Sequence, residues 1–356
     1  MVDINIIMQN KLSYCDNPMD RKLSVVMQGS VLDQNHCLSS AVIDNILTTR
    51  YQYPEIEFVV STWEIDSESK NRLEKLANEH SLTIVYNKDP GVISSLDGVV
   101  SSNINRMIVS TKNGIKASNG KYVLKIRTDS KLYNNRLAHI LLHLFESRVN
   151  RIRDDSFKVF ENYVINCNLF ARDGRGYLPY LFHPGDICLA GAKDDLLLLF
   201  DIPLADHNIF SNISRACFLS FMKYVPEQYI WVYCIYNSKG NIVYPGNDHY
   251  NSSFIELSEQ YYINNFIALA PSQIGFDWPK HESVYKNKGL YSIYSLNDWK
   301  VIYNRYNKKY FSINRSKLYI KLFVTICTTI YFFVRTCLLR VPLLRKLAIK
   351  YFRKRG

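Results

Sequence analysis

The chain of 356 residues lacks the short motifs by which several common enzyme classes are recognised. It has no Walker phosphate loop, no G-x-G-x-x-G dinucleotide loop and no G-x-S-x-G nucleophile element. Its eight cysteines form no C-x-x-C pair, and its eight histidines show no paired metal-ligand spacing. These absences argue against enzymes built on those motifs. They also favour buried free thiols in a body that folds in a reducing compartment.

Acidic residues are missing from the C-terminal end of the chain. No Asp or Glu follows Asp298, whereas residues 299–356 carry 15 Lys or Arg. Subtracting these 15 charges from the net charge of +12 leaves −3 for residues 1–298. The basicity therefore belongs to a tail. A slightly acidic body argues against nucleic acid as a partner, because a nucleic-acid-binding body is expected to be basic.

The tail also lacks a long uncharged run. Its longest, residues 322–334, has 13 residues, against about 20 for a membrane-spanning helix. Beyond it Arg335, Arg340 and Arg345 recur in a pattern typical of an amphipathic helix on anionic lipid. We therefore expect residues 299–356 to form a basic amphipathic tail that holds the protein peripherally on a membrane. The alternatives are a helix packed on the core and a true membrane span.

Short apolar runs alternate with helical patterns along the rest of the chain. Strands are expected near residues 23–28, 57–62, 82–86 and 122–126, separated by helices near residues 38–50, 67–80 and 104–117. Each strand is a short apolar run rather than an alternating one, as expected where helices cover both faces of a sheet. This order predicts an α/β domain with a mostly parallel sheet over residues 23–298, after an N-terminal extension of residues 1–22.

One of these strands ends on residues suited to binding a ligand. The run 122–126 is followed by Arg127, Thr128 and Asp129. Ligands of open α/β sheets bind outside the carboxyl ends of the strands, so Asp129 is a candidate to hold a divalent cation, Mn²⁺ or Mg²⁺, or a ribose hydroxyl. A lone Asp at such a position more often caps a turn. Arg106 and Arg127 raise the odds of a site because their planar groups suit phosphate oxygens.

Other candidate residues follow further along the chain. The pair Gln28-Gly29 ends the first strand, where a nucleotide base commonly lies over a doubly wound sheet. A transferase acting on a hydroxyl acceptor needs a general base within hydrogen-bond reach. The candidate carboxylates are Asp186 and Glu227, which we assign as catalytic, with Asp248 as the remaining alternative.

Several motifs occur in order between residues 23 and 235. They are V-V-M-Q-G-S, S-T-W-E, D-P-G, N-x-N-R-x-x-x-S-T-x-x-G, K-Y-V-L-K-I-R-T-D, G-D-I-x-x-x-G and P-E-Q-Y-I-W. In this order they resemble the WavE lipopolysaccharide synthesis family. The resemblance implies a glycosyltransferase of the A-type, Rossmann-like fold. Such an enzyme would move a sugar from a nucleotide-sugar donor to a lipopolysaccharide or lipid-linked surface-polysaccharide acceptor, at the cytoplasmic face of the inner membrane.

The resemblance also implies roles for particular residues. Those expected to bind the nucleotide sugar are Gln28, Gly29, Asn105, Arg106, Arg127 and Asp129, and Asp129 would also be the metal ligand. The acidic metal motif of this fold is usually aspartate-x-aspartate, but Lys131 occupies the position of the second acid. Lys131 or Arg127 would then neutralise the leaving diphosphate in place of a metal.

Two other functions remain as alternatives. The missing second carboxylate motivates a catalytically inert, membrane-bound assembly factor of polysaccharide biosynthesis, which would not bind nucleotide sugars. A phosphotransferase is less favoured, because no glycine loop is present to cradle a phosphate.

Overall fold

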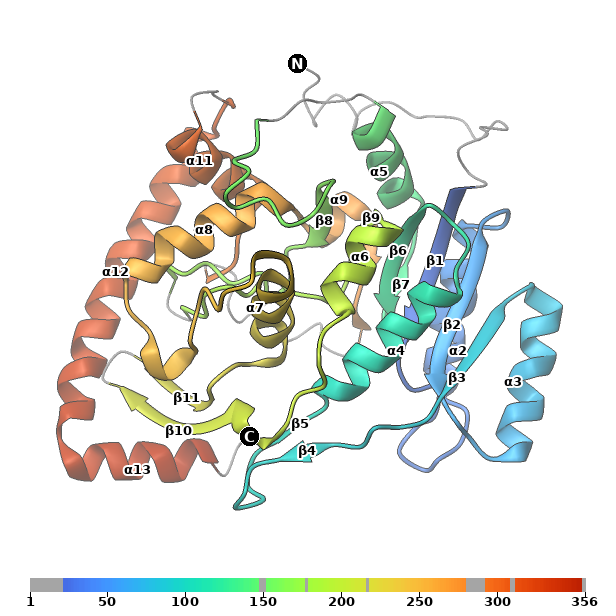
Figure 1. Ribbon diagram of the computed structural model, residues 1–356, viewed down its shortest axis with the longest axis horizontal. Helices are drawn as coiled ribbons and strands as arrows, with labels where there is room; N and C mark the ends of the chain where they lie inside the picture. The colour runs from blue at the N-terminus through green and yellow to red at the C-terminus, as the bar shows by residue number, and fades with distance from the viewer. Residues whose placement is uncertain are drawn as a thin grey trace.

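The computed structural model describes most of the chain as an α/β body followed by C-terminal helices (Figure 1). The described residues are 22–146, 152–176, 179–215, 218–279, 292–307 and 311–353. The expected N-terminal extension, residues 1–22, lies outside the described residues except for Lys22.

The body is built on a seven-stranded sheet with the order β12-β8-β9-β6-β1-β2-β3. The strands are β1 (Leu23–Gln28), β2 (Glu57–Trp63), β3 (Thr83–Asn87), β6 (Tyr122–Arg127), β8 (Val164–Cys167), β9 (Leu189–Ala192) and β12 (Phe266–Leu269). β9 runs antiparallel to β6 and β8, and the remaining neighbours pair in parallel. The expected α/β class and mostly parallel sheet are therefore confirmed.

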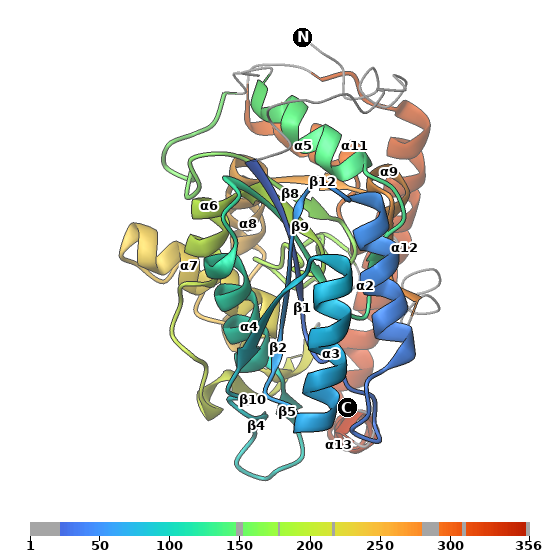
Figure 2. The same cartoon turned by 90° about the vertical axis from the view of Figure 1, so that its right-hand side faces the viewer.

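Helices cover both faces of the parallel half of the sheet. Figure 2 shows α2 (Ser40–Gln52) and α3 (Ser67–His80) on one side and α4 (Ile104–Ala117) on the other. All six residues of β1 are buried, which explains why its apolar residues Val25, Val26 and Met27 are consecutive rather than alternating with polar ones. Each of the two outer helices begins at a side-chain cap, Ser39 or Asp66, which accepts a hydrogen bond from a backbone N–H of the first turn.

The ends of β1 and β6 lie side by side and position the site described below. Gln28 and Arg127 are partners in the parallel register, and the N–H of Thr128 donates to the carbonyl of Gln28 at 3.0 Å. Gly29 follows with φ +134°, and a Cβ there would lie 2.7 Å from Oγ1 of Thr128. The chain leaves β1 toward β2, whereas β6 lies on the opposite side of β1. This junction is a topological switch point, where an open α/β sheet binds its ligands.

The remaining described elements lie around this sheet. They are β4 (Ile93–Ser94), β5 (Ser101–Ser102), β7 (Lys131–Leu132), α5 (Arg136–Glu146), α6 (Lys193–Phe200), η2 (His207–Ile209), β10 (Phe210–Arg215), β11 (Phe218–Met222), α7 (Pro226–Lys239), η3 (Asn247–His249), α8 (Ser253–Asn265), α9 (Pro271–Ile274) and β13 (Phe276–Asp277). Aromatic side chains fill the core between α7 and the sheet. Trp231 packs edge-on against Phe266, with ring centroids 4.9 Å apart.

The expected boundary between body and tail falls inside α11 (Leu296–Tyr306). Trp299 and Tyr303 of this helix are buried, and Nε1 of Trp299 donates to the carbonyl of Phe266 at 2.6 Å. Residues 299–306 therefore pack with the core of the body.

Two helices end the described chain, α12 (Arg315–Arg340) and α13 (Pro342–Arg353). Figure 1 shows α12 running along one side of the body and α13 starting at the end of α12 and running at an angle to it. α12 has 26 residues, and its most apolar window has a mean hydropathy of 1.9 and is 11% buried. By length and composition it could cross a membrane, a criterion that the 13-residue uncharged run did not meet.

The face of α12 that contacts the body is partly polar. Its less exposed residues recur at helical spacing and include Lys321, Thr325 and Thr328. Nζ of Lys321 lies 2.7 Å from Oδ2 of Asp173 and 3.7 Å from Oδ2 of Asp298. Burial alone would lower the pKa of Lys321, but these two carboxylates outweigh it and raise the pKa. α12 is thus fixed along the body by a charged contact.

Candidate functional site

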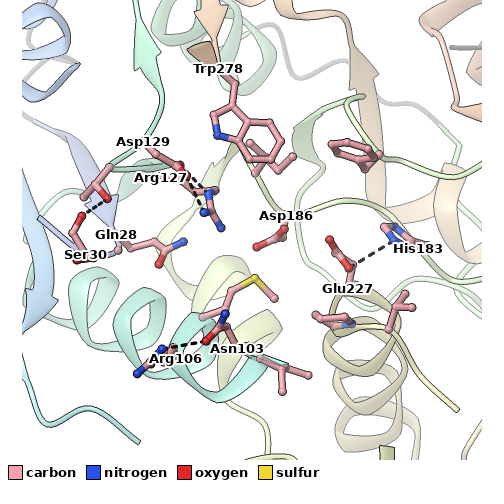
Figure 3. A pocket seen from close by; sticks show the side chains of 18 of the residues that line it. Gln28, Ser30, Asn103, Arg106, Arg127, Asp129, His183, Asp186, Glu227 and Trp278 are labelled. Atoms are coloured by element: carbon pink, nitrogen blue, oxygen red, sulfur yellow. Dashed lines mark hydrogen bonds and ion pairs between the residues drawn. The ribbon is translucent and has the colours of Figure 1, made fainter. Parts of the chain in front are cut away.

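A cavity of about 630 Å³ opens beyond the carboxyl ends of β1, β2 and β6 (Figure 3). This volume lies within the range of roughly 300–1,000 Å³ that is common for small-molecule sites. Its wall comes from the ends of these three strands, Val42 of α2, the start of α4, several residues between Phe170 and Ile187, the start of α7 and Trp278. The cavity therefore gathers residues that are far apart in the sequence.

One end of the cavity combines apolar walls with a fixed amide. Gln28 and Gly29 lie there at the end of β1, and Val42, Trp63 and Met107 are apolar residues of the cavity wall. Oε1 of Gln28 accepts a hydrogen bond from Oγ of Ser110 at 2.7 Å, which orients the amide and leaves its NH₂ group on the other side. This end suits a flat, polar-edged group such as a nucleotide base, the role expected for Gln28-Gly29.

Arg127 and Asp129 form a planar ion pair in the middle of the cavity wall. Nε and Nη2 of Arg127 donate to the two carboxylate oxygens of Asp129 at 2.8 and 2.9 Å. The guanidinium also lies 5.5 Å from the ring centroid of Trp278. Burial would lower the pKa of Arg127, but the hydrogen bonds and charge of Asp129 outweigh it and raise the pKa. Arg127 is thus a permanent, rigidly held cation beside the cavity.

Arg106 lies at the rim, on the first turn of α4. It makes two hydrogen bonds to Asp89, at 2.8 and 2.5 Å, and a third to Oδ1 of Asn103 at 3.0 Å. These contacts with Asp89 outweigh desolvation and raise the pKa of Arg106. Asp89 also accepts from the N–H of Gly91, so the expected D-P-G turn serves to hold this arginine. Arg106 lines the cavity as expected, but it is already paired.

Asn105 does not have the position expected of a ligand-binding residue. Its amide is buried and exchanges two hydrogen bonds with the backbone of Ala205, at 2.9 and 2.8 Å. The Asn105 side chain therefore ties α4 to the segment after α6, and it is not among the residues that line the cavity. Asn103, two residues earlier, lines the cavity instead.

The other end of the cavity contains Asp186 above a buried lysine. Lys125, on β6, has no exposed side-chain surface, and its Nζ lies 3.3 Å from Oδ2 of Asp186. The same ammonium donates to the backbone carbonyl of Asp186. Desolvation lowers the pKa of Lys125, and the charge of Asp186 opposes this. A lysine from the central sheet therefore fixes the orientation of one of the two expected catalytic carboxylates.

Glu227, the second expected catalytic carboxylate, lies near Asp186 at the start of α7 (Figure 3). Loss of solvent, and then the negative charge of Asp186, raise the pKa of Glu227 to about 7. Oε2 of Glu227 lies 3.4 Å from Nε2 of His183. Burial and the nearby charge of Arg172 hold the pKa of His183 well below its usual range, so this imidazole is neutral. A carboxylate that titrates near neutral pH beside a neutral histidine can accept a proton from a bound hydroxyl.

Two of the alternatives considered from the sequence lie elsewhere. Asp248 is in η3, 3.9 Å from Nε2 of His249, and does not line the cavity. Lys131 is on β7, where it lies opposite Asp277 of the antiparallel strand β13, and it does not line the cavity either.

Several residues of the site were not predicted from the sequence. Lys125, Arg172, His183 and Trp278 all contribute to it, yet none was assigned a role. Lys125 had a visible signal, since it is a charged residue inside the apolar run Y-V-L-K-I. Arg172 and Trp278 carried no such signal, because only the tertiary fold brings their segments to the cavity.

The A-type fold that the family resemblance implies usually binds a divalent cation, and the residues of the cavity can be compared with what such an ion requires. Within the described ranges, no group of three or more His, Cys, Asp or Glu is placed to hold a metal ion. Both oxygens of Asp129, the expected ligand, accept hydrogen bonds from Arg127. Asp186, another carboxylate of the cavity wall, is paired with Lys125. The residues of this cavity do not fit a resident metal ion.

A family model described as WavE lipopolysaccharide synthesis matches residues 23–332. The match extends well beyond the motifs recognised up to residue 235 and includes much of α12. No curated protein sequence matches the chain.

The chain is only weakly similar to solved structures. A mannosyltransferase, PcManGT from Pyrobaculum calidifontis in complex with GDP-Man and Mn²⁺, is 13% identical with a TM-score of 0.33, covering 56% of this chain and 52% of that one. A cytidylyltransferase from Leptospira borgpetersenii is 12% identical (TM-score 0.30; 52% and 66% covered). S. aureus TarS 1–349 is 12% identical (TM-score 0.31; 79% and 63% covered). The chain thus spans less than two thirds of each of these proteins, and at such TM-scores none of them carries an argument about function.

Proposed function

The chain belongs to the WavE lipopolysaccharide synthesis family, and from this premise we propose that it is a glycosyltransferase of the A-type fold. It would move a sugar from a nucleotide-sugar donor to a lipopolysaccharide or lipid-linked surface-polysaccharide acceptor. The observation that carries the proposal is one cavity at the sheet's switch point that holds both a cationic wall and a carboxylate titrating near pH 7.

The two ends of the cavity suit the two halves of such a reaction. The base of the donor would occupy the end lined by Gln28, Gly29 and Trp63, and its diphosphate would lie against Arg127. The sugar would then face Asp186 and Glu227. This order follows the direction from β1 to α7 along the cavity wall (Figure 3).

Glu227 would act as the general base. Its carboxylate would accept the proton of the acceptor hydroxyl as that oxygen forms a bond to the anomeric carbon of the donor. The bond from this carbon to the diphosphate oxygen breaks, and its electron pair leaves with the nucleoside diphosphate. A base with a pKa near the working pH is suited to this step, since it is both available and able to take the proton.

A thermal-shift screen with UDP-, GDP-, CMP- and dTDP-sugars tests the proposal, followed by turnover of any donor that binds. Glu227→Gln should keep donor binding and lower kcat by roughly 100- to 10,000-fold, the usual contribution of a general base. The matched control is Glu256→Gln, an exposed residue of α8 outside the cavity. Full activity of Glu227→Gln would remove the base assignment. Failure of every donor to bind would favour an inert assembly factor instead.

For the C-terminal helices we propose peripheral attachment to the cytoplasmic face of the inner membrane, next to the acceptor. On α12 the apolar residues Tyr319, Phe323, Ile330 and Phe333 are between 59% and 70% exposed. They follow the same helical spacing as the body-facing residues but are displaced by two positions, or about 200° around the helix. The apolar stripe therefore points away from the body, as suits a helix lying on lipid.

The charge of this region supports an anionic lipid surface. No acidic residue follows Asp298, and each basic residue close to such a surface contributes about 1 kcal/mol. The ion pairs of Lys321 with Asp173 and Asp298 favour a helix that lies along the body over one that leaves it to span the bilayer.

Co-flotation with vesicles of phosphatidylglycerol and phosphatidylethanolamine tests this attachment. Phe323→Glu combined with Phe333→Glu should abolish flotation and leave the contacts of Lys321 in place. Deletion of the whole helix would remove those contacts as well. The matched control is Leu96→Glu, because Leu96 is 90% exposed but lies far from the tail in sequence. Unchanged flotation of the double variant would rule out α12 as the attachment surface.

A further inference from the structure

The carboxylate expected to bind a metal is already paired with an arginine through both of its oxygens. Asp129 receives Nε and Nη2 of Arg127 side-on, with one hydrogen bond to each oxygen. A divalent cation on these oxygens would have to displace the guanidinium and would then remain beside its positive charge. The pair also lies against Trp278, which limits how far Arg127 could move.

The geometry leaves part of the arginine available to a ligand. Among the described residues, the hydrogen bonds of the Arg127 guanidinium use only Nε and Nη2. Nη1 and its two protons have no acceptor in the part of the chain that the structure describes, on a side chain that lines the cavity. Because Asp129 and Trp278 hold the plane of the guanidinium, these donors are preorganised and lose little entropy when an anion binds.

We infer that this site binds the donor diphosphate without a divalent cation, through Arg127 oriented by Asp129 and assisted by Arg172. This inference rests on the proposed function and specifies how its leaving group is neutralised. Arg127 donates to the diphosphate, Asp129 is a positioning residue, and Arg172 supplies a second cation from the segment 170–187.

Charge accounting in the cavity supports this arrangement. As the bond to the sugar breaks, its electron pair moves onto a phosphate oxygen, so negative charge increases on the diphosphate. Asp129 and Asp186 are each compensated by their own cation, Arg127 and Lys125. A cation that is already fixed in place stabilises such developing charge without reorganisation, which is the task that a metal performs in other sites.

Calorimetric titration of the full-length protein with UDP, GDP, CDP and dTDP tests the inference. Each titration is done in EDTA and again in excess MnCl₂ or MgCl₂. We expect at least one nucleoside diphosphate to bind in EDTA, with an affinity that the metals change less than threefold. Turnover of the matching nucleotide sugar should likewise survive EDTA.

Variants separate the roles of the two residues. Arg127→Lys keeps the charge but loses the planar fork, so affinity in EDTA should fall roughly 10- to 100-fold, as for loss of charge-assisted hydrogen bonds. Arg136→Lys, an exposed residue of α5 outside the cavity, is the matched control. Asp129→Asn should weaken binding by the same factor with and without metal, because it disturbs Arg127 alone. If Asp129 were instead a metal ligand, Asp129→Asn would lose only the increase in affinity that the metal provides.

The outcomes distinguish this inference from the proposed function. Binding that appears with Mn²⁺ or Mg²⁺ and disappears in EDTA would leave the glycosyltransferase proposal intact and overturn the inference. A loss confined to the metal titrations in Asp129→Asn would overturn it as well. No binding of any nucleotide under either condition would refute both.

Discussion

The raised pKa of Glu227 predicts a gain in stability when the base is removed. The pKa rises from an ordinary value of 4.5 to about 7, a difference of about 2.5, and each pKa unit corresponds to 1.36 kcal/mol. The folded protein therefore holds this proton more tightly than the unfolded chain. Its stability falls as the pH rises through the window from 4.5 to about 7, where the folded state binds more protons. Above that window the ionised carboxylate costs about 3 kcal/mol.

Glu227→Gln removes this cost because the amide is never ionised. By the same relation, the variant should exceed the wild type by about 1 kcal/mol at pH 5.5 and about 3 kcal/mol at pH 8. For a chain of 356 residues, a gain of about 3 kcal/mol corresponds to a Tm roughly 4 °C higher. Urea unfolding and calorimetry at the two pH values measure both quantities.

The control variant and the refuting result both depend on comparing stability at pH 5.5 with stability at pH 8. Glu256→Gln on the exposed face of α8 should change stability equally at pH 5.5 and pH 8. If the gain of Glu227→Gln is also the same at both, then the cavity does not hold Glu227 with a raised pKa. In that case the assignment of Glu227 as a base working near neutral pH loses its physical basis. The pH–rate profile of the wild type should independently show an acid limb near pH 7.

Two further substitutions test how the site is built. Lys125→Met should destabilise the protein by about 3–5 kcal/mol in urea unfolding, because Asp186 would keep a buried, uncompensated charge. Adding Asp186→Asn should recover part of this loss, and no recovery would mean that the ion pair is not the cause. Gly29→Ala should cost at least about 1–3 kcal/mol, since φ +134° strains any L side chain and the new Cβ meets Thr128. Pairing it with Thr128→Ala should relieve only the contact, and full recovery would contradict the strain argument.

The parallel half of the fold was predictable because each strand is a short, mainly apolar run between helical patterns. β1, β2, β3 and β6 lie within a residue or two of their expected positions. β9 was not predicted, since L-A-G-A has four residues and none of them is β-branched. The pairs that this strand makes with β6 and β8 come entirely from tertiary contacts.

The candidate site was predictable in part for the same reason. Gln28 and Arg127 end adjacent parallel strands, so local pattern was enough to bring them together at one edge of the sheet. Asp186 and Glu227 were found by residue type alone, and nothing in the sequence indicated that they share a cavity. Asn105 is next to Arg106 in the motif, but neighbours on a helix point about 100° apart, and its side chain bonds Ala205 instead of lining the cavity.

The acidic motif lacks its second carboxylate at Lys131, and the backbone geometry explains which residue Asp129 meets instead. In an extended strand, residues two apart point to the same face, so a metal motif read forward from Asp129 draws attention to Lys131. The strand ends at Arg127, however, and the chain turns at Thr128 and Asp129, which sends Lys131 into β7. The residue two positions before Asp129, still on the strand, is the one that meets it. Asp129 is therefore paired with the cation that precedes it, and its carboxylate orients an arginine toward the cavity.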